Sequence, residues 1–199
     1  MAGGLRKDLV TGAIAIVAMT IVLGLLYPLA ITGIAQVAFP GAANGSKVSV
    51  NGKVVGSHLI GQEFKGKVWF QPRPSATEYS GNVTFFGNGG PNSVEVRDRI
   101  REELAAYVRL NKPYDHSLTR EDVPVDAVTQ SASGVDPDIS EANALIQAHR
   151  IAAVRHLPLS KVEELISQNT DGRSLGVLGE PGVNALELNI AIDREAPLK

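Results

Sequence analysis

The sequence has no cysteine among its 199 residues, which excludes disulfide bridges and metal sites built on thiolates. Aromatic residues make up only 5% of the chain. The 19 basic residues form no long run and are outnumbered by 21 acidic residues, so the net charge is −2. Because nucleic-acid binding depends on concentrated positive charge, no nucleic-acid partner is expected.

Local motifs for catalysis are missing as well. The chain has neither the G-x-S-x-G elbow of a serine nucleophile nor the H-E-x-x-H spacing of a zinc site. Residues 61–67, GQEFKGK, match most of a phosphate-binding P-loop. However, Val68 stands where Ser or Thr should hold magnesium, and prolines follow where a helix should begin. We therefore expect no enzymatic activity, no metal ligand and no cofactor belonging to this chain alone.

Charged residues are absent from a long stretch near the N-terminus, between Asp8 and Lys47. Its most apolar part, residues 9–31, would form a helix about 34 Å long. Such a helix crosses the hydrocarbon core of a membrane, which is about 30 Å thick. The alternative is a cleaved signal peptide that starts with Arg6 and Lys7, but the apolar region of such a peptide has only about 7–15 residues. The pattern favours an uncleaved transmembrane helix.

The basic residues Arg6 and Lys7 precede this span, and cytoplasmic flanks of membrane helices favour Lys and Arg. We therefore expect residues 1–8 in the cytoplasm, residues 32–47 as an exit segment and linker, and residues 48–199 as an extracytoplasmic soluble domain. The expected location is the cell (inner) membrane, which the chain crosses once.

Apolar residues at helical spacing predict three helices in this domain, over residues 93–110, 140–156 and 160–168. Asn92 or Ser93 would cap the first helix, and the third begins with an S-x-x-E capping box. The second helix is expected to turn five side chains toward a core: Ala144, Leu145, Ala148, Ile151 and Ala152.

Strands are predicted in three places. An Asn-Gly pair between valines predicts a hairpin over residues 47–56. Residues 68–70, Val-Trp-Phe, resemble a short buried strand, and residues 186–192 alternate apolar and polar side chains, as in a half-buried final strand. Residues 80–92 are rich in Gly and Asn and should form either a functional loop or a plain surface loop. The expected fold is one N-terminal transmembrane helix followed by a single mixed α+β domain.

Four segments of the domain carry a family resemblance. Taken in their order along the chain and together with the N-terminal span, the four segments resemble the C subunit of the bacterial Kdp potassium-transporting ATPase over nearly the whole chain. Two features depart from the family pattern: residues 83–86 are inserted, and Asp138 stands where the family often has His. The four segments are residues 69–76 (WFQPRPSA), residues 80–92, residues 124–140 followed by Gln147, Arg150 and Arg155, and residues 172–189.

The resemblance implies a heteromeric pump. Its other members would be a channel-like potassium subunit, a P-type ATP-hydrolysing subunit and a small single-span subunit, all in a lipid bilayer. This chain would be the accessory and assembly subunit of a high-affinity, ATP-driven potassium uptake complex. Potassium would be the transported ion, and ATP would be bound only together with the hydrolysing subunit. An unrelated membrane-anchored sensor or ligand-binding domain is the alternative.

The resemblance also implies roles for particular residues. The family's C subunit is described as a catalytic chaperone that raises the ATP affinity of the hydrolysing subunit, and Gln71 would then contact the nucleotide. An extracytoplasmic domain meets no cytosolic ATP, so we favour a domain that lies over the outer mouth of the channel-like subunit and stabilises assembly. Arg73 would pair either with a partner's acid or within the chain. The residues expected to contact partners or to support the structure are Arg73, Asp136, Gly179, Glu180, Pro181 and Asn184.

Overall fold

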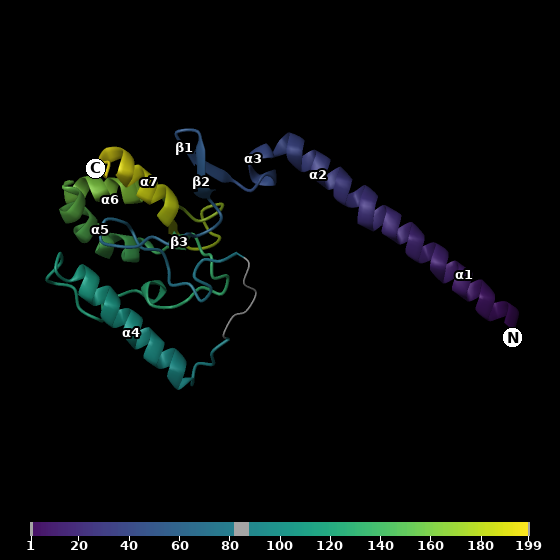
Figure 1. Ribbon diagram of the computed structural model, residues 1–199, viewed down its shortest axis with the longest axis horizontal. Coiled ribbons are helices and arrows are strands. Elements are labelled where there is room, and N and C mark those ends of the chain that lie inside the picture. Colours follow the sequence, from purple (N-terminus) through teal and green to yellow (C-terminus); the bar gives the residue numbers. More distant parts are fainter. Residues whose placement is uncertain (1, 82–87, 199) are drawn as a thin grey trace. The chain divides into compact units, whose positions relative to one another are not determined.

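The computed structural model describes residues 2–81 and 88–198 (Figure 1). The chain divides into two compact units, residues 1–47 and 48–199, which we describe separately. The inserted residues 83–86 of the Gly- and Asn-rich segment lie outside the described residues. The described remainder of that segment has no helix or strand, as predicted.

The first unit is a long apolar helix. Helix α1 (Ala2–Met19) continues through the π-helix η1 (Thr20–Leu26) into α2 (Tyr27–Ala38), and a short α3 (Pro40–Ala43) follows. The helical stretch Gly4–Ala38 has 35 residues, the mean hydropathy of its most apolar 18-residue window is 2.6, and no residue in the stretch is buried. Helical structure therefore extends beyond residues 9–31 on both sides.

The π-helix lies just before Pro28, which cannot donate a backbone hydrogen bond and whose ring crowds the carbonyl group four residues earlier. Widening the preceding turns accommodates it: the N–H of Tyr27 bonds to the carbonyl of Val22, five residues back. The long helix ends before Pro40, where Phe39 has left helical geometry (φ −140°, ψ 56°). Residues before a proline are disfavoured in the α region, which accounts for this end.

The second unit begins with the predicted hairpin. Strand β1 (Lys47–Val50) pairs with β2 (Lys53–Ser57). Asn51 and Gly52 between them have φ of 50° and 77°, the left-handed values that a tight two-residue turn requires. The prediction from the Asn-Gly pair is confirmed.

The three predicted helices are present as α4 (Val94–Asn111), α5 (Glu141–Arg155) and α6 (Leu159–Gln168). The hydroxyl of Ser93 caps α4, and that of Ser140 caps α5 by accepting from the N–H of Asn143 at 3.1 Å. Two details were wrong. Helix α6 begins directly after Pro158, so its serine lies inside the helix and caps nothing, and Leu145 of α5 is 39% exposed.

A small antiparallel sheet joins distant parts of the domain. Its strands β3 (Asp138–Ile139), β5 (Gly182–Asn184) and β4 (Thr170–Asp171) lie in that order, with Asp138 opposite Asn184 and Thr170 opposite Val183. These strands have only two or three residues, too few for any alternation of side chains to reveal them in the sequence.

The predicted final strand is wrong, because residues 185–195 form helix α7 (Ala185–Glu195). Leu188 and Ile192 are fully buried, and residues four apart share a helix face as readily as residues two apart share a strand face. The side chain of Asn184 accepts a hydrogen bond from the N–H of Glu187 at 3.2 Å and caps the helix. The N-x-x-E spacing was therefore a helix signal that the alternation concealed.

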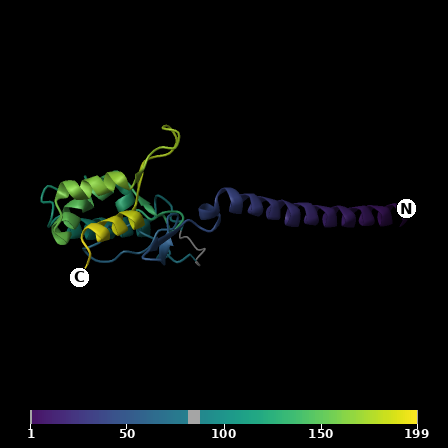
Figure 2. The same cartoon turned by 90° about the horizontal axis from the view of Figure 1, so that it is seen from above.

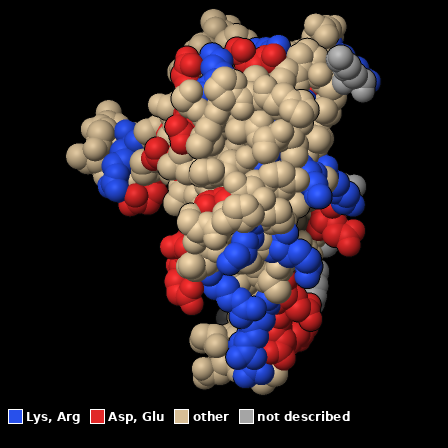
Figure 3. Space-filling view, turned by 90° about the vertical axis from the view of Figure 1, so that its left-hand side faces the viewer, with Lys and Arg blue, Asp and Glu red and all other residues tan. Residues whose placement is uncertain are grey.

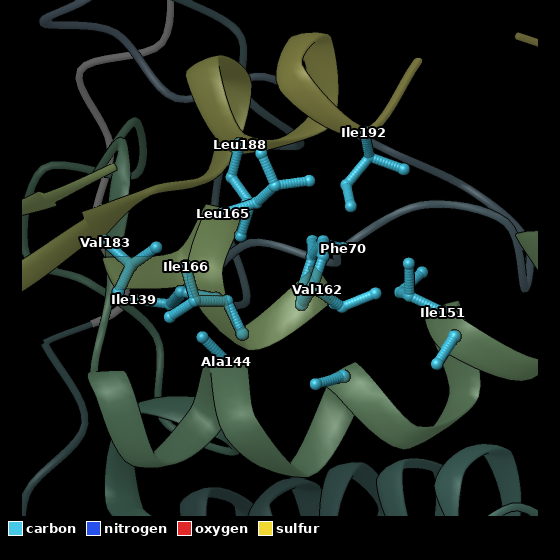
Figure 4. Close-up of a cluster of buried hydrophobic side chains, with 12 residues drawn as sticks. Phe70, Ile139, Ala144, Ile151, Val162, Leu165, Ile166, Val183, Leu188 and Ile192 are labelled. Atoms are coloured by element: carbon cyan, nitrogen blue, oxygen red, sulfur yellow. The ribbon is translucent and has the colours of Figure 1, made fainter. Parts of the chain in front are cut away.

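The core lies among α5, α6, α7 and the small sheet (Figure 4). Figure 4 shows Ile151 of α5, Val162 of α6 and Ile192 of α7 directed toward Phe70, whose side chain is fully buried. Each buried side chain of this size stabilises the fold by roughly 1.5–3 kcal/mol. A second cluster, Tyr107 with Ala127 and Val128, packs α4 against the 3₁₀ turn η2 (Val125–Ala127). The α+β prediction is confirmed.

Candidate functional site

The segment from Lys67 to Gln71 is the centre of the site, and its main chain is bound by side chains. The prediction of a strand at residues 68–70 is wrong, because these residues form a turn and a bend that lead into a segment without helix or strand. Asn189 of α7 accepts from the N–H of Phe70 at 2.8 Å and donates to its carbonyl at 2.9 Å. Gln147 of α5 does the same for Gln71, at 2.7 and 3.0 Å. Each amide side chain thus takes the place of a peptide group in a neighbouring strand.

Arg150 of α5 completes this arrangement and is fully buried. Its Nη1 donates to the carbonyl oxygens of Lys67 and Trp69. Its Nε donates to Oδ1 of Asn111, and its Nη2 donates to Oε1 of Gln147 at 2.7 Å. Among the described residues no carboxylate pairs with it, and burial lowers the pKa of its guanidinium to about 10. It therefore stays charged at neutral pH and is held by neutral acceptors alone.

Arg155, one turn further along α5, binds the same segment. Its Nε donates to the carbonyl of Val68 at 2.9 Å, and its Nη1 pairs with Asp193 at 3.1 Å. Its guanidinium carbon lies 4.5 Å from the centre of the Trp69 ring, a cation–π contact. We call Gln147, Arg150, Arg155 and Asn189 the clamp residues, because together they hold residues 67–71 in place.

The clamp positions Gln71 at the edge of a cavity of about 690 Å³. The side chain of Gln71 makes one hydrogen bond among the described residues, from Nε2 to the carbonyl of Gly66 at 3.3 Å. Three basic and three acidic residues face the cavity, so its lining carries no single-sign field. These residues are Lys65, Lys67, Arg109, Glu63, Glu78 and Glu103.

Arg73 was expected to pair either within the chain or with an acidic residue of a partner. The structure shows the first of these, a salt bridge with Asp136. Nη1 of the arginine lies 3.0 Å from Oδ2 of Asp136, and both side chains are 28% exposed. Its Nε donates to the carbonyl of Thr129 at 3.1 Å. Arg73 therefore pairs within the chain and ties the segment after the clamp to residues 129–136. Half-buried pairs of this kind contribute about 1 kcal/mol.

The remaining predicted residues lie in the loop between β4 and β5 and in strand β5. Gly179 (φ 83°), Glu180 and Pro181 belong to the loop between β4 and β5, where Glu180 pairs with Arg173 at 2.7 Å. Asn184 is buried: it caps α7 and donates from Nδ2 to the carbonyl of His58 at 2.9 Å. The structure thus brings Arg73 and Asp136 together and leaves the loop residues apart from Gln71.

Acidic residues gather near His58, which follows the hairpin. Its Nδ1 lies 3.0 Å from Glu187, and its Nε2 lies 3.7 Å from Asp171. The pKa of Asp138 is raised, mainly because the carboxyl group is partly buried and also because Asp136 and Asp171 are close. Between its unfolded and folded pKa values, the folded state binds more protons than the unfolded state. Stability therefore falls as pH rises through this window, and the charged Asp138 is unfavourable at neutral pH.

Replacing Asp138 with Asn is expected to stabilise the protein at pH 7 by about 0.5 kcal/mol, a small value because solvent screens this half-exposed group. The advantage should disappear below about pH 4, where aspartate is protonated even in the unfolded chain. Urea unfolding of the full chain in detergent, followed by the fluorescence of its single tryptophan, measures both values. A destabilised Asp138→Asn variant at pH 7 would contradict this interpretation.

Comparison with known proteins places the chain in a family. The family profile described as K+-transporting ATPase, c chain, matches residues 9–194. The potassium-transporting ATPase KdpC subunit of Streptomyces avermitilis is 43% identical over 201 residues, which cover 91% of this chain and 90% of that protein. The KdpC subunit of Koribacter versatilis is 39% identical over 98% of each chain, and that of Mycobacterium tuberculosis is 41% identical over 96% of this chain and 100% of its own. The chain belongs to the KdpC family, the c chain of the K+-transporting ATPase.

Proposed function

We propose that this KdpC-family chain is a non-catalytic accessory and assembly subunit of a high-affinity, ATP-driven potassium uptake complex in the cell (inner) membrane. The observation that carries the proposal is the 35-residue apolar helix Gly4–Ala38, whose most apolar part buries nothing within the protein. An apolar helix that packs against nothing in its own chain is stable in lipid or against other membrane helices. Family membership argues against an unrelated anchored sensor.

The orientation follows from charge. Arg6 and Lys7 lie at the N-terminal end of the helix, and after Asp8 no charged residue occurs before Lys47. Basic flanks stay in the cytoplasm, so the N-terminus is cytoplasmic and residues 48–199 are extracytoplasmic. The clamped segment 67–71 and the following prolines give this domain a rigid surface for a partner.

The partners of the proposed complex are a channel-like potassium subunit, a P-type ATP-hydrolysing subunit and a small single-span subunit. In this arrangement, ion passage and ATP hydrolysis belong to the partners. The domain of this chain lies over the outer mouth of the channel-like subunit, where it stabilises the assembled complex.

A second candidate function is that of a catalytic chaperone that raises the ATP affinity of the hydrolysing subunit. The observation in its favour is the position of Gln71 beside a cavity that Lys65, Lys67 and Arg109 also line. Three glutamates line the same cavity, so the basic and acidic residues balance. A nucleoside triphosphate, which is strongly negative, favours a site with net positive charge. The assembly function is therefore better supported.

A single substitution separates the two functions. Gln71→Ala removes one side-chain hydrogen bond and leaves the main-chain bonds to Gln147 intact. We expect the purified complex to keep its yield and its KM for ATP, while omission of the whole chain lowers the yield. The matched control is Gln168→Ala on the exposed side of α6. A severalfold rise in KM at normal yield, seen only for Gln71→Ala, would replace the assembly function with the chaperone function.

A further inference from the structure

The loop of residues 172–181 between β4 and β5 is a well-formed projection of the domain. Figure 2 shows this yellow-green segment extending away from the helices. Ser174 and Leu178 exchange two main-chain hydrogen bonds, of 2.8 and 2.9 Å, and the ion pair of Arg173 with Glu180 closes the base. These contacts restrain the conformation in which the loop presents its end residues.

The end of this loop is apolar and exposed. Leu175, Val177 and Leu178, which we call the tip patch, are 90%, 72% and 58% exposed. Leu175 also has φ of 54°, a value that disfavours leucine and suits Gly or Asn. The turn does not require apolar side chains at these positions. Each side chain that stays in water lacks the stabilisation of roughly 1.5–3 kcal/mol that its burial would provide. The patch is best explained by a surface that covers it.

Charge decides which kind of surface fits. The face of the domain drawn in Figure 3 carries a band of basic side chains with acidic side chains along both of its sides. Near the tip, Arg173 is neutralised by Glu180, and Asp171 adds a negative charge at the base. Loops and helices that bind anionic lipid use unpaired Lys and Arg together with apolar residues. A protein pocket without charge is the better match.

We propose that the tip patch docks into an uncharged apolar pocket on the extracytoplasmic side of another subunit of the same potassium-transporting ATPase. This inference rests on the proposed assembly function and names the surface that performs it. Three apolar side chains on a rigid loop are a small but preorganised anchor, and such anchors carry a large share of binding energy when they fill a pocket.

The first test measures retention of the full chain in the complex, with all subunits co-expressed. The variant Leu175→Asn/Val177→Thr/Leu178→Thr should bind its partners on the order of thirtyfold more weakly, the fold-change for losing one hot-spot side chain. The control Leu59→Asn removes another exposed apolar side chain and should bind normally. Equal urea midpoints of the variant and the unmodified chain show that the fold is intact. Unchanged retention of the triple variant overturns the proposal.

The second test identifies what covers the tip. Ser174→Cys provides the only cysteine of the chain, next to an intact tip patch, for a photoreactive maleimide. The expected product is a crosslink to another pump subunit. Crosslinks mainly to lipid, or to a second copy of this chain, would overturn the inference. If the unmodified chain fails to co-purify with a P-type subunit, the proposed function itself fails; if it co-purifies and only the tip results are negative, the docking inference alone fails.

Discussion

Replacing Arg150 with methionine is expected to destabilise the domain by about 3–5 kcal/mol, a large part of the total stability of a typical domain. The substitution leaves the acceptors on Lys67, Trp69 and Asn111 without this donor, and Gln147 keeps only the N–H of Gln71 as a donor to its Oε1. Each unsatisfied buried acceptor costs about 1–3 kcal/mol. Removing the buried charge recovers only about 3 kcal/mol, the equivalent of the lowered pKa. The lost hydrogen bonds therefore outweigh the recovered solvation.

Trp69 makes this prediction convenient to measure. It is the only tryptophan, and its ring contacts Arg155 within the clamped segment, so its fluorescence reports on the clamp during urea unfolding. The control Arg101→Met breaks an exposed pair with Asp98 and should change the stability by less than about 0.5 kcal/mol. Arg150→Lys keeps the charge but cannot form the forked set of bonds, so an intermediate loss is expected. If Arg150→Met unfolds at the same urea concentration as the unmodified chain, the clamp is not needed for stability.

The helices that could be predicted from sequence are those with local signals. Helices α4 and α5 each combine a serine cap with an apolar stripe, and both begin where predicted. The hairpin was predictable for the same reason, since Asn51 and Gly52 specify the turn by themselves. The strand predicted over residues 186–192 is part of helix α7. The prediction failed because, in a segment this short, the same apolar residues can lie on one face of a strand or on one face of a helix.

The clamp could not be derived from sequence because its partners are far apart along the chain. Asn189 lies 119 positions from Phe70, and Gln147 lies 76 positions from Gln71. The family resemblance indicated Gln147, Arg150 and Arg155 without assigning them a role. The tip patch was missed because Leu175, Val177 and Leu178 look like ordinary core residues until the fold leaves them exposed.

Residue accessibility from outside the cell is the second prediction with a large expected effect, because it is nearly all-or-none. The chain has no native cysteine, so every introduced thiol is unique. Ser167→Cys places one on the exposed side of α6, and Gly4→Cys places one in the N-terminal turn of α1. A charged maleimide does not cross the membrane, so it reaches only the outer side of intact cells or spheroplasts. Lysed membranes give the full labelling of both variants.

Labelling of these two variants in intact cells is the most direct test of the claim that a membrane helix holds the domain outside the cytoplasm. We expect Ser167→Cys to label as fully in intact cells as in lysed membranes, and Gly4→Cys to label only after lysis, because the basic residues Arg6 and Lys7 hold that end inside. The reverse pattern, with Gly4→Cys labelled outside and Ser167→Cys protected, would contradict the account and place the domain in the cytosol.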